Sequence, residues 1–302
     1  NTLEEAISFV DDINKIRNHT DTHFNIALIR ASINTNDEFY NKERDFFDEN
    51  MPRIQNLDNL FYKALLNSKH TDGLVSHFGE QLFVLAKVEL NTYHPSINDL
   101  LVKENKLISE YDKLIASADI LYKDEHLNLS QFNKYFINPD RDIRKEAYIT
   151  KEQFFEEHLE KIDRIYDDLV QVRHEIALKL GYNNFIQLGY DRMQRIGYNA
   201  EDVEVFRNQI KDHVVPITEQ INKQHAERIN VDQLKVYDQN FTFKSGSPKP
   251  QIGTQEIIKN AQKMYHERSN ETGKFIDYMI DKSLFDLEAK KGKESGGHCT
   301  II

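Results

Sequence analysis

The sequence predicts a mainly α, multi-helical fold of long antiparallel helices, with a small β-hairpin and minor β-structure near the C-terminus. Apolar residues make up 39% and charged residues 29% of the 302-residue chain. This polar balance fits elongated helices with broad solvated faces. Apolar side chains recur at helical spacing through most of the sequence, and proline and glycine punctuate those stretches.

The clearest helical stretch lies between residues 138 and 181. Asn138-Pro139 is typical of a helix start, and Leu180-Gly181 is typical of a left-handed helix end. Between them a stripe recurs at alternating steps of four and three, and only Arg173 interrupts it. Its members are Phe155, Leu159, Ile162, Tyr166, Leu169, Ile176 and Leu180. A phase slip near Phe154-Phe155 leaves open one very long helix or two nearly collinear ones.

Helical spacing also covers much of the remaining chain. The expected helices are 3–17, 19–33, 37–49, 57–66, 76–92 and 97–118, with breaks at Pro52, Gly73 and Pro95. A further helix begins near Asn199, and Pro216 should kink or divide it. A last helix is expected from Thr254 to about Ser283.

Two stretches favour extended structure. Residues 120–122 and 127–129 flank a turn-forming segment and predict the β-hairpin, and residues 235–244 alternate in a way that indicates a strand or an extended arm. Residues 246–253 are rich in proline and glycine and predict a loop. We expect two regions, an amino-terminal helical region at 1–137 and a second helical region at 138–302.

The net charge of −11 argues against nucleic acid or an anionic membrane as the main partner. The one cysteine, Cys299, suits a reducing compartment. The first residues have neither the basic start nor the apolar stretch of a signal peptide, and no apolar run is long enough to cross a membrane. These features predict a cytoplasmic protein.

From Leu180 onward an ordered series of short segments is similar to the M3 family of zinc oligopeptidases, in its thimet-like oligoendopeptidase F branch. The series comprises 180–185, 188–193, 214–216, 237–238, 246–250, 264–265, 271–273, 284–287, 291–293 and 296–300. Upstream, residues 35–40, 107–111 and 114–118 resemble the amino-terminal helical part of that branch. The resemblance covers the front half of such an enzyme.

The resemblance implies a metalloendopeptidase that cleaves internal bonds of short peptides with zinc held by His, His and Glu. In the family, a Gly-Gly-x-Cys-Thr segment leads into a strand at the active-site cleft. Carried over, it makes Gly296, Gly297, His298 and Cys299 candidate substrate-binding residues, with glycines that leave a peptide backbone free to approach. The alternative is a simple turn that enters a strand. His298 stands where tyrosine is common in the family.

No histidine of the sequence starts an H-E-x-x-H motif, which places two imidazoles and a glutamate on one helical face. His174-Glu175 and His266-Glu267 both lack the second imidazole. His19 and His23 have ligand spacing, but Asp21 would lie off their face and Thr20 looks like a helix start, so we interpret them as exposed histidines beside a helix boundary. We therefore expect no catalytic and no metal-binding residue in this chain.

Two further features near the C-terminus have simpler explanations than a functional site. A nucleophilic Cys299 is disfavoured because its neighbour His298 would point to the opposite face of a strand. The basic run Lys290-Lys291-Gly292-Lys293 is interpreted as a solvated helix end rather than a phosphate site.

We expect the chain to be the amino-terminal portion of a zinc metalloendopeptidase, inactive alone, with short peptides and the missing C-terminal catalytic half as its partners. The alternative is a non-enzymatic helical peptide-binding or interaction module.

Overall fold

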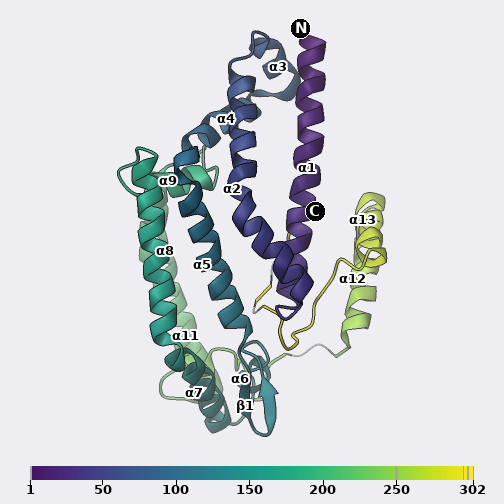
Figure 1. Ribbon diagram of the computed structural model, residues 1–302. Helices are drawn as coiled ribbons and strands as arrows, with labels where there is room; N and C mark the ends of the chain where they lie inside the picture. Colours follow the sequence, from purple (N-terminus) through teal and green to yellow (C-terminus); the bar gives the residue numbers. More distant parts are fainter. Residues whose placement is uncertain (1, 249–250, 295, 298, 302) are drawn as a thin grey trace. The chain divides into compact units, whose positions relative to one another are not determined.

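A computed structural model describes residues 2–248, 251–294, 296, 297 and 299–301. The chain divides into two compact units. Unit 1 contains Asn1–Ile115, Glu157–Glu219 and Gly297–Ile302, and unit 2 contains Ala116–Glu156 and Gln220–Gly296. Helices dominate, and the sheet found in the described part of the chain is one two-stranded hairpin (Figure 1), which confirms the predicted fold class.

The first core of unit 1 lies among α1 (Leu3–Ile33), α2 (Glu38–Leu66), α3 (Thr71–Phe78) and α4 (Glu80–Thr92). Helices α1 and α2 run antiparallel, and the guanidinium of Arg17 lies 2.7 Å from the carboxylate of Asp58 across them. The apolar faces of the four helices exclude water from a shared cluster. Its buried members are Val10, Phe61, Tyr62, Leu65, Leu74, Phe83 and Ala86.

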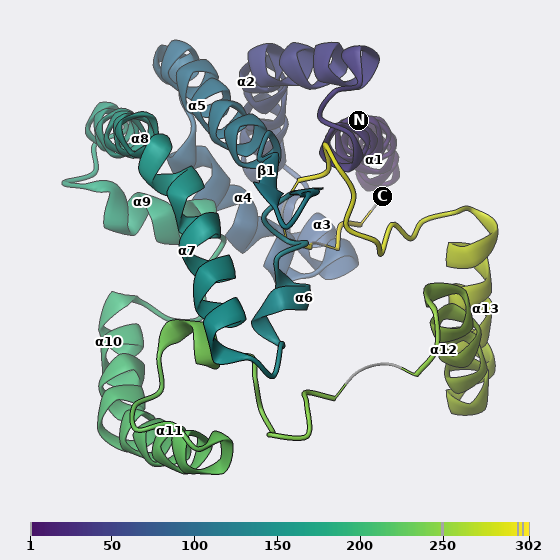
Figure 2. The ribbon, with the colours of Figure 1, turned by 90° about the horizontal axis from the view of Figure 1, so that it is seen from below.

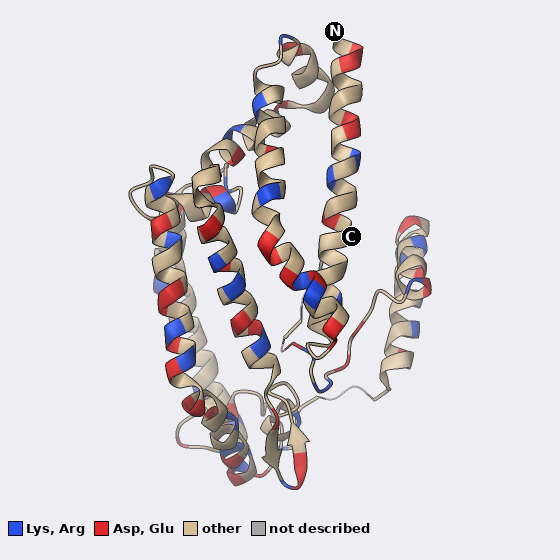
Figure 3. Ribbon diagram, in the orientation of Figure 1, with Lys and Arg blue, Asp and Glu red and all other residues tan. Residues whose placement is uncertain are grey.

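The second core of unit 1 lies among the 3-10 turn η1 (Pro95–Ile97), α5 (Asn98–Ala116), α8 (Leu159–Lys179) and α9 (Phe185–Arg192). The predicted stripe of α8 supplies several of its side chains, including Ile176 and the partly buried Ile162 and Leu169. Acidic and basic residues are both spread along α5 and α8 (Figure 3). Arg164 on α8 reaches Glu110 on α5 at 2.6 Å, so paired charges border the apolar seam.

Helix α1 is continuous, so the expected boundary between two helices at residues 17–19 is wrong. The hydroxyl of Thr20 donates to the carbonyl oxygen of Ile16, one turn back, at 3.0 Å. A threonine that bonds backwards in this way sits inside a helix and does not cap one. His19 and His23 therefore both lie within one continuous helix, away from its ends.

Helix α2 passes through Pro52, where a break was expected. Proline has no N–H, so the carbonyl oxygen of Asp48 loses its helical partner at this point. The side-chain amide of Asn105, on α5, donates to that oxygen at 3.1 Å. A neighbouring helix thus satisfies the group that the proline leaves free. The expected break at Gly73 is also wrong, because α3 includes Gly73 and the chain turns at Gly79, where φ is +85°.

Pro216 has the predicted effect of dividing a helix. Helix α10 (Ala200–Gln209) continues into the π-helical segment η2 (Ile210–Val214) and then into α11 (Val215–Ile229). The N–H of Val215 bonds to the carbonyl oxygen of Ile210, five residues back. The wider turn accommodates a proline that cannot donate to residue 212.

Unit 2 begins with a hairpin, β1 (Ile120–Tyr122) paired antiparallel with β2 (Glu125–Leu127). The first strand is as predicted, but the second begins two residues earlier than the expected 127–129, because Lys123 and Asp124, both with positive φ, are enough to form the turn. It packs with α6 (Asn133–Phe136) and α7 (Arg141–Glu157) around a core of Tyr122, Leu127, Phe132, Phe136 and Ala147. Helix α7 ends at Glu157 and α8 starts at Leu159, so the stretch from 138 to 181 contains two helices.

The strand expected at 235–244 is wrong. Residues Val236–Asp238 form the 3-10 turn η3, and the described residues from 235 to 301 contain no strand. Asp238 is fully buried, and its carboxylate accepts from Arg141, from Arg144 and from the backbone N–H of Lys235. Because this carboxylate is buried and bonded to both arginines, the backbone around it forms a turn. The side chains therefore do not alternate between two faces as they would in a strand.

The last predicted helix is a pair of helices, α12 (Thr254–Arg268) and α13 (Asn270–Asp281), which lie side by side in Figure 2. Ser269 is extended, and its hydroxyl accepts from the N–H of Thr272, so it ends one helix and caps the next. The imidazole of His266 bonds to Asp277 at 2.9 Å across the pair. Gly273 provides the space, because a Cβ there would lie 2.5 Å from the His266 ring.

No helix in the described part of the chain is long and apolar enough to cross a membrane. The division of the chain into regions 1–137 and 138–302 stays a prediction.

Candidate substrate-binding segment

Residues 284–301 follow α13 as a segment without helix or strand in its described part, and they carry the predicted site. Asp286 organises the start of this segment. Its carboxylate lies 2.5 Å from the ammonium of Lys290 and 2.6 Å from that of Lys293. Burial raises the pKa of Asp286, but the hydrogen bonds from the two lysines outweigh burial and hold the pKa below its usual value.

The middle of the segment contacts the hairpin of unit 2. The side-chain amide of Asn128 donates to the carbonyl oxygen of Lys290 at 2.9 Å. The ammonium of Lys291 lies 2.6 Å from the carboxylate of Asp119, which also bonds to the ring of His126. The hydrogen bond from Lys291 is the largest cause of a lowered pKa at Asp119. These bonds fix the backbone immediately before the predicted site.

The same contacts change the interpretation of the basic run. It was expected at a helix end, but α13 ends at Asp281, nine residues earlier than Lys290. Lys290, Lys291 and Lys293 each pair with a carboxylate. Ammonium groups neutralised in this way have little charge left to offer a phosphate, so the run serves to hold the segment in place.

The predicted site itself is exposed. Gly296, Gly297 and Cys299 are all exposed, while His298 lies outside the described residues. Among the described residues, which leave out 295 and 298 on either side, no heavy atom lies within 4 Å of the position that a Cβ would take at Gly296 or Gly297. Gly296 has φ of +97°, a conformation that favours glycine, whereas Gly297 does not. The backbone of this glycine pair is therefore open to an approaching chain.

Within unit 1, the residues that follow the glycines are held by α1. The side-chain amide of Asn25 donates to the carbonyl oxygen of Ile301 at 2.9 Å. Sequence analysis could not indicate this contact, because 276 positions separate the two residues.

The described residues include no group of three or more His, Cys, Asp or Glu side chains that could hold a metal ion. His266 bonds to Asp277 alone among carboxylates, and His225 bonds to the backbone oxygen of Phe241. The donor set of this part of the chain does not fit a zinc site of the His, His and Glu type.

Several residues of the family segments have structural roles. The hydroxyl of Tyr182 donates to Asp191 at 2.6 Å. Arg192 and Arg173 both pair with Glu104, which is 2% exposed, at 2.9 and 2.7 Å. Arg173 interrupted the apolar stripe for this reason, and that interruption was the signal of a buried acidic partner. Only the fold shows that the partner is on α5.

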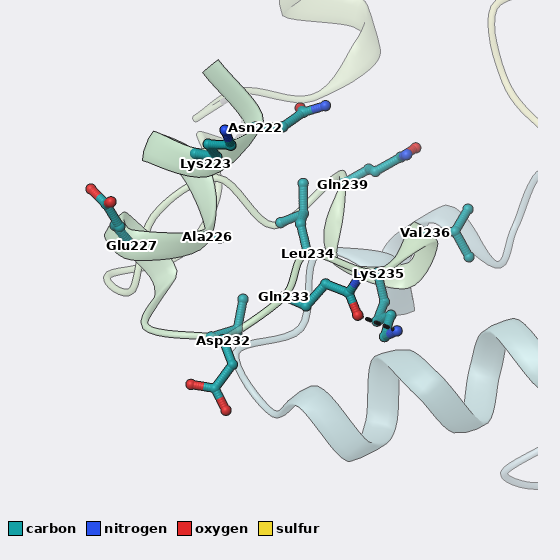
Figure 4. A pocket seen from close by; sticks show the side chains of 11 residues that line it. Asn222, Lys223, Ala226, Glu227, Asp232, Gln233, Leu234, Lys235, Val236 and Gln239 are labelled. Atoms are coloured by element: carbon teal, nitrogen blue, oxygen red, sulfur yellow. Dashed lines mark hydrogen bonds between the residues drawn. The ribbon is translucent and has the colours of Figure 1, made fainter. Parts of the chain in front are cut away.

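Unit 2 also contains a half-open hollow of about 430 Å³ between α11 and the residues that follow it (Figure 4). Its apolar lining includes Ala226 and Leu234, and Asn222, Lys223 and Gln239 border it. Sequence analysis did not indicate this hollow, and only three of its lining residues, Lys235, Val236 and Gln239, lie in the stretch that was expected to be a strand or an extended arm.

Two protein-family sequence models match this chain. A sequence model of the peptidase M3 N-terminal domain matches residues 1–93, and the model of peptidase family M3 matches residues 135–302. The second match alone covers more than half of the chain. The chain belongs to peptidase family M3, as the resemblance predicted. No curated protein matches the sequence closely.

Solved structures narrow the similarity to particular relatives. A structure of Pz peptidase A with an inhibitor is 49% identical, with a TM-score of 0.97, and the match covers 98% of this chain and 53% of that one. A protein described as an oligoendopeptidase F from Bacillus anthracis is 43% identical over 99% of this chain and 55% of its own, with a TM-score of 0.97. A further oligoendopeptidase F is 45% identical over 95% and 51%, with a TM-score of 0.94. The chain spans about half the length of these relatives.

Proposed function

We propose that this chain forms the peptide-binding part of a zinc metalloendopeptidase that cleaves internal bonds of short peptides. Gly296, Gly297, His298 and Cys299 would contact the backbone of the bound peptide. The observation that carries this proposal is the glycine pair Gly296 and Gly297, where no heavy atom of the described residues occupies the space of a Cβ. A peptide in extended form can add its backbone hydrogen bonds to such a segment, since no side chain blocks the approach.

Zinc and the water that it activates are assigned to residues outside this sequence. The reason is the donor set: the sequence has no H-E-x-x-H motif, and the described residues do not fit a zinc site. The relatives, which are almost twice as long, have room for such residues. A zinc ion held by those residues would activate water for hydrolysis of the peptide bond. This chain would line one side of the peptide-binding site and would select which peptides bind.

The proposed partners are short peptides and the catalytic remainder of the enzyme. Nucleic acid and anionic membranes are disfavoured as partners because the chain carries a net charge of −11. A cytoplasmic location is proposed because the chain has a single cysteine, which forms no disulfide.

The test compares two glycine-to-valine variants of the 302-residue chain. Gly297→Val adds a branched side chain at the proposed contact, and Gly197→Val adds the same side chain at an exposed glycine elsewhere. Neither glycine has a positive φ, and neither has a heavy atom within 4 Å of the Cβ position, so both variants should fold. We expect Gly297→Val to weaken binding of a fluorescent short peptide, measured by anisotropy, by about tenfold or more, as losing close backbone contacts costs at least 1.4 kcal/mol.

Gly197→Val should bind the peptide as the unsubstituted chain does. Equal peptide affinity of the two variants would contradict the assignment of the site. Hydrolysis of the peptide by the purified chain after addition of zinc would contradict the assignment of zinc to other residues. Failure of the unsubstituted chain to bind peptides while it binds another protein would favour the interaction module.

A further inference from the structure

One pair of histidines in this chain has the spacing of two metal ligands on a helix. His19 and His23 are four residues apart, and no other two of the twelve histidines share that spacing. Sequence analysis argued against a site here because Asp21 would lie off that face and because a helix seemed to begin at Thr20, and only the second objection is removed by the structure. Helix α1 instead runs unbroken from Leu3 to Ile33, so both histidines lie on one face of one helix.

The two imidazole rings lie in contact at the surface. Their centroids are 4.5 Å apart, and the rings are nearly perpendicular, at 85°. Both residues are exposed, and no hydrogen bond or ion pair joins either ring to another residue in the described ranges. In contrast, His126 and His266 bond to carboxylates. The ring nitrogens of His19 and His23 are therefore free to bind an incoming ligand.

The charges around the pair do not oppose a cation. Arg17 is paired with Asp58 at 2.7 Å, and Lys15 with Asp12 at 2.9 Å. The basic groups nearest in sequence are thus neutralised by carboxylates. The chain as a whole carries a net charge of −11, which adds a favourable long-range term for a divalent cation at low salt.

We propose that His19 and His23 form a surface site for one divalent transition-metal ion of the Ni²⁺, Cu²⁺ or Zn²⁺ class. Two imidazoles at i and i+4 on a helix can bind one ion together, and exposed side chains can rotate to direct one nitrogen each toward it. Water completes the coordination, since the surface is open. Among these ions the affinity is expected to be highest for Cu²⁺. This site is independent of the proposed peptide binding.

The test titrates Ni²⁺ into the 302-residue chain by calorimetry, with Cys299→Ser in every sample to remove the exposed thiol. We expect one ion per chain, and His19→Ala or His23→Ala should each weaken binding by about tenfold or more, because one imidazole alone forms no chelate.

A spacing variant separates chelation from the mere presence of histidines. Asp21→His combined with His23→Ala keeps two imidazoles, but places them two residues apart and on opposite sides of α1. This variant should bind Ni²⁺ as weakly as His23→Ala. Binding as tight as in the unsubstituted pair, by this variant or by His23→Ala, would overturn the proposal. Circular dichroism of each variant checks that α1 is still helical.

Discussion

Asp238 is the residue whose replacement should cost unit 2 the most stability. Its side chain is fully buried. The carboxylate lies 2.8 Å from the guanidinium of Arg141 and 2.8 Å from that of Arg144, and Arg144 is itself only 1% exposed. It also accepts the backbone N–H of Lys235 at 3.0 Å. In Asp238→Asn, an amide NH₂ group would face these donors and the arginines would lose their counter-charge.

The expected loss follows from the burial of Arg144. Removing one partner of a buried ion pair leaves an uncompensated charge and costs about 3–5 kcal/mol of unfolding free energy. With about 2.1 cal/mol/K of unfolding entropy per residue over roughly 300 residues, this lowers a cooperative thermal midpoint by about 5–8 °C. Urea denaturation followed by circular dichroism measures the free energy directly.

The stabilisation by Asp238 should also depend on pH. Burial raises the pKa of Asp238, but the hydrogen bonds from Arg141 and Arg144 outweigh it, so the pKa in the folded protein lies below its usual value. The stabilisation is therefore present above the unfolded pKa of about 3.9 and is lost as the pH falls through the folded pKa. The free-energy difference between Asp238→Asn and the unsubstituted chain should be constant from pH 7 to 5 and should shrink below about pH 4.

The matched control is Asp232→Asn, an exposed aspartate six residues earlier. This change should alter the unfolding free energy by no more than about 0.5 kcal/mol. If Asp238→Asn cost less than about 1 kcal/mol at pH 7, the carboxylate would not be compensating the buried guanidinium, and the reasoning would be refuted.

Two further changes test local packing and ionisation. Gly273→Ala should destabilise the chain by about 1–2 kcal/mol, because the new methyl would lie 2.5 Å from the His266 ring; Gly189→Ala, whose methyl would meet a ring carbon at 3.4 Å, serves as the control in thermal unfolding. A stabilised Gly273→Ala variant would show that the ring does not occupy that space. Burial, and then a hydrogen bond to Glu146, raise the pKa of Tyr122 to about 12. The folded protein should therefore lose about 2–3 kcal/mol of stability between pH 10 and 12, since the unfolded phenol ionises first, and Tyr122→Phe should abolish that loss in alkaline denaturation curves.

Much of the fold could be predicted because the signals were local. The hairpin at residues 120–127 and the helix start at Asn199 follow from residues close in the chain. The errors occurred where a distant group decides the outcome. A proline predicts a helix break, but Asn105 satisfies the carbonyl group that Pro52 leaves free. Alternation predicts a strand at 235–244, but two arginines of α7 draw Asp238 inward.

The candidate site shows the same division. The order of short segments was enough to indicate peptidase family M3 and to select Gly296 and Gly297 as candidates. The sequence could not show that Asp286 and Asp119 hold the basic run, because that pairing depends on how the chain returns to the hairpin. The assignment of the glycines and Cys299 to substrate binding stays a prediction.

The family, the helical fold class and the position of most helices follow from residues close together in the chain, since caps, periodicity and segment order are local features. Which helices continue through a break signal, which charges are buried in pairs, and that His19 and His23 share one helix face depend on how distant segments pack. The physical reason is that a backbone carbonyl or a buried charge needs a partner, and in this chain that partner often comes from a helix 50 or more residues away.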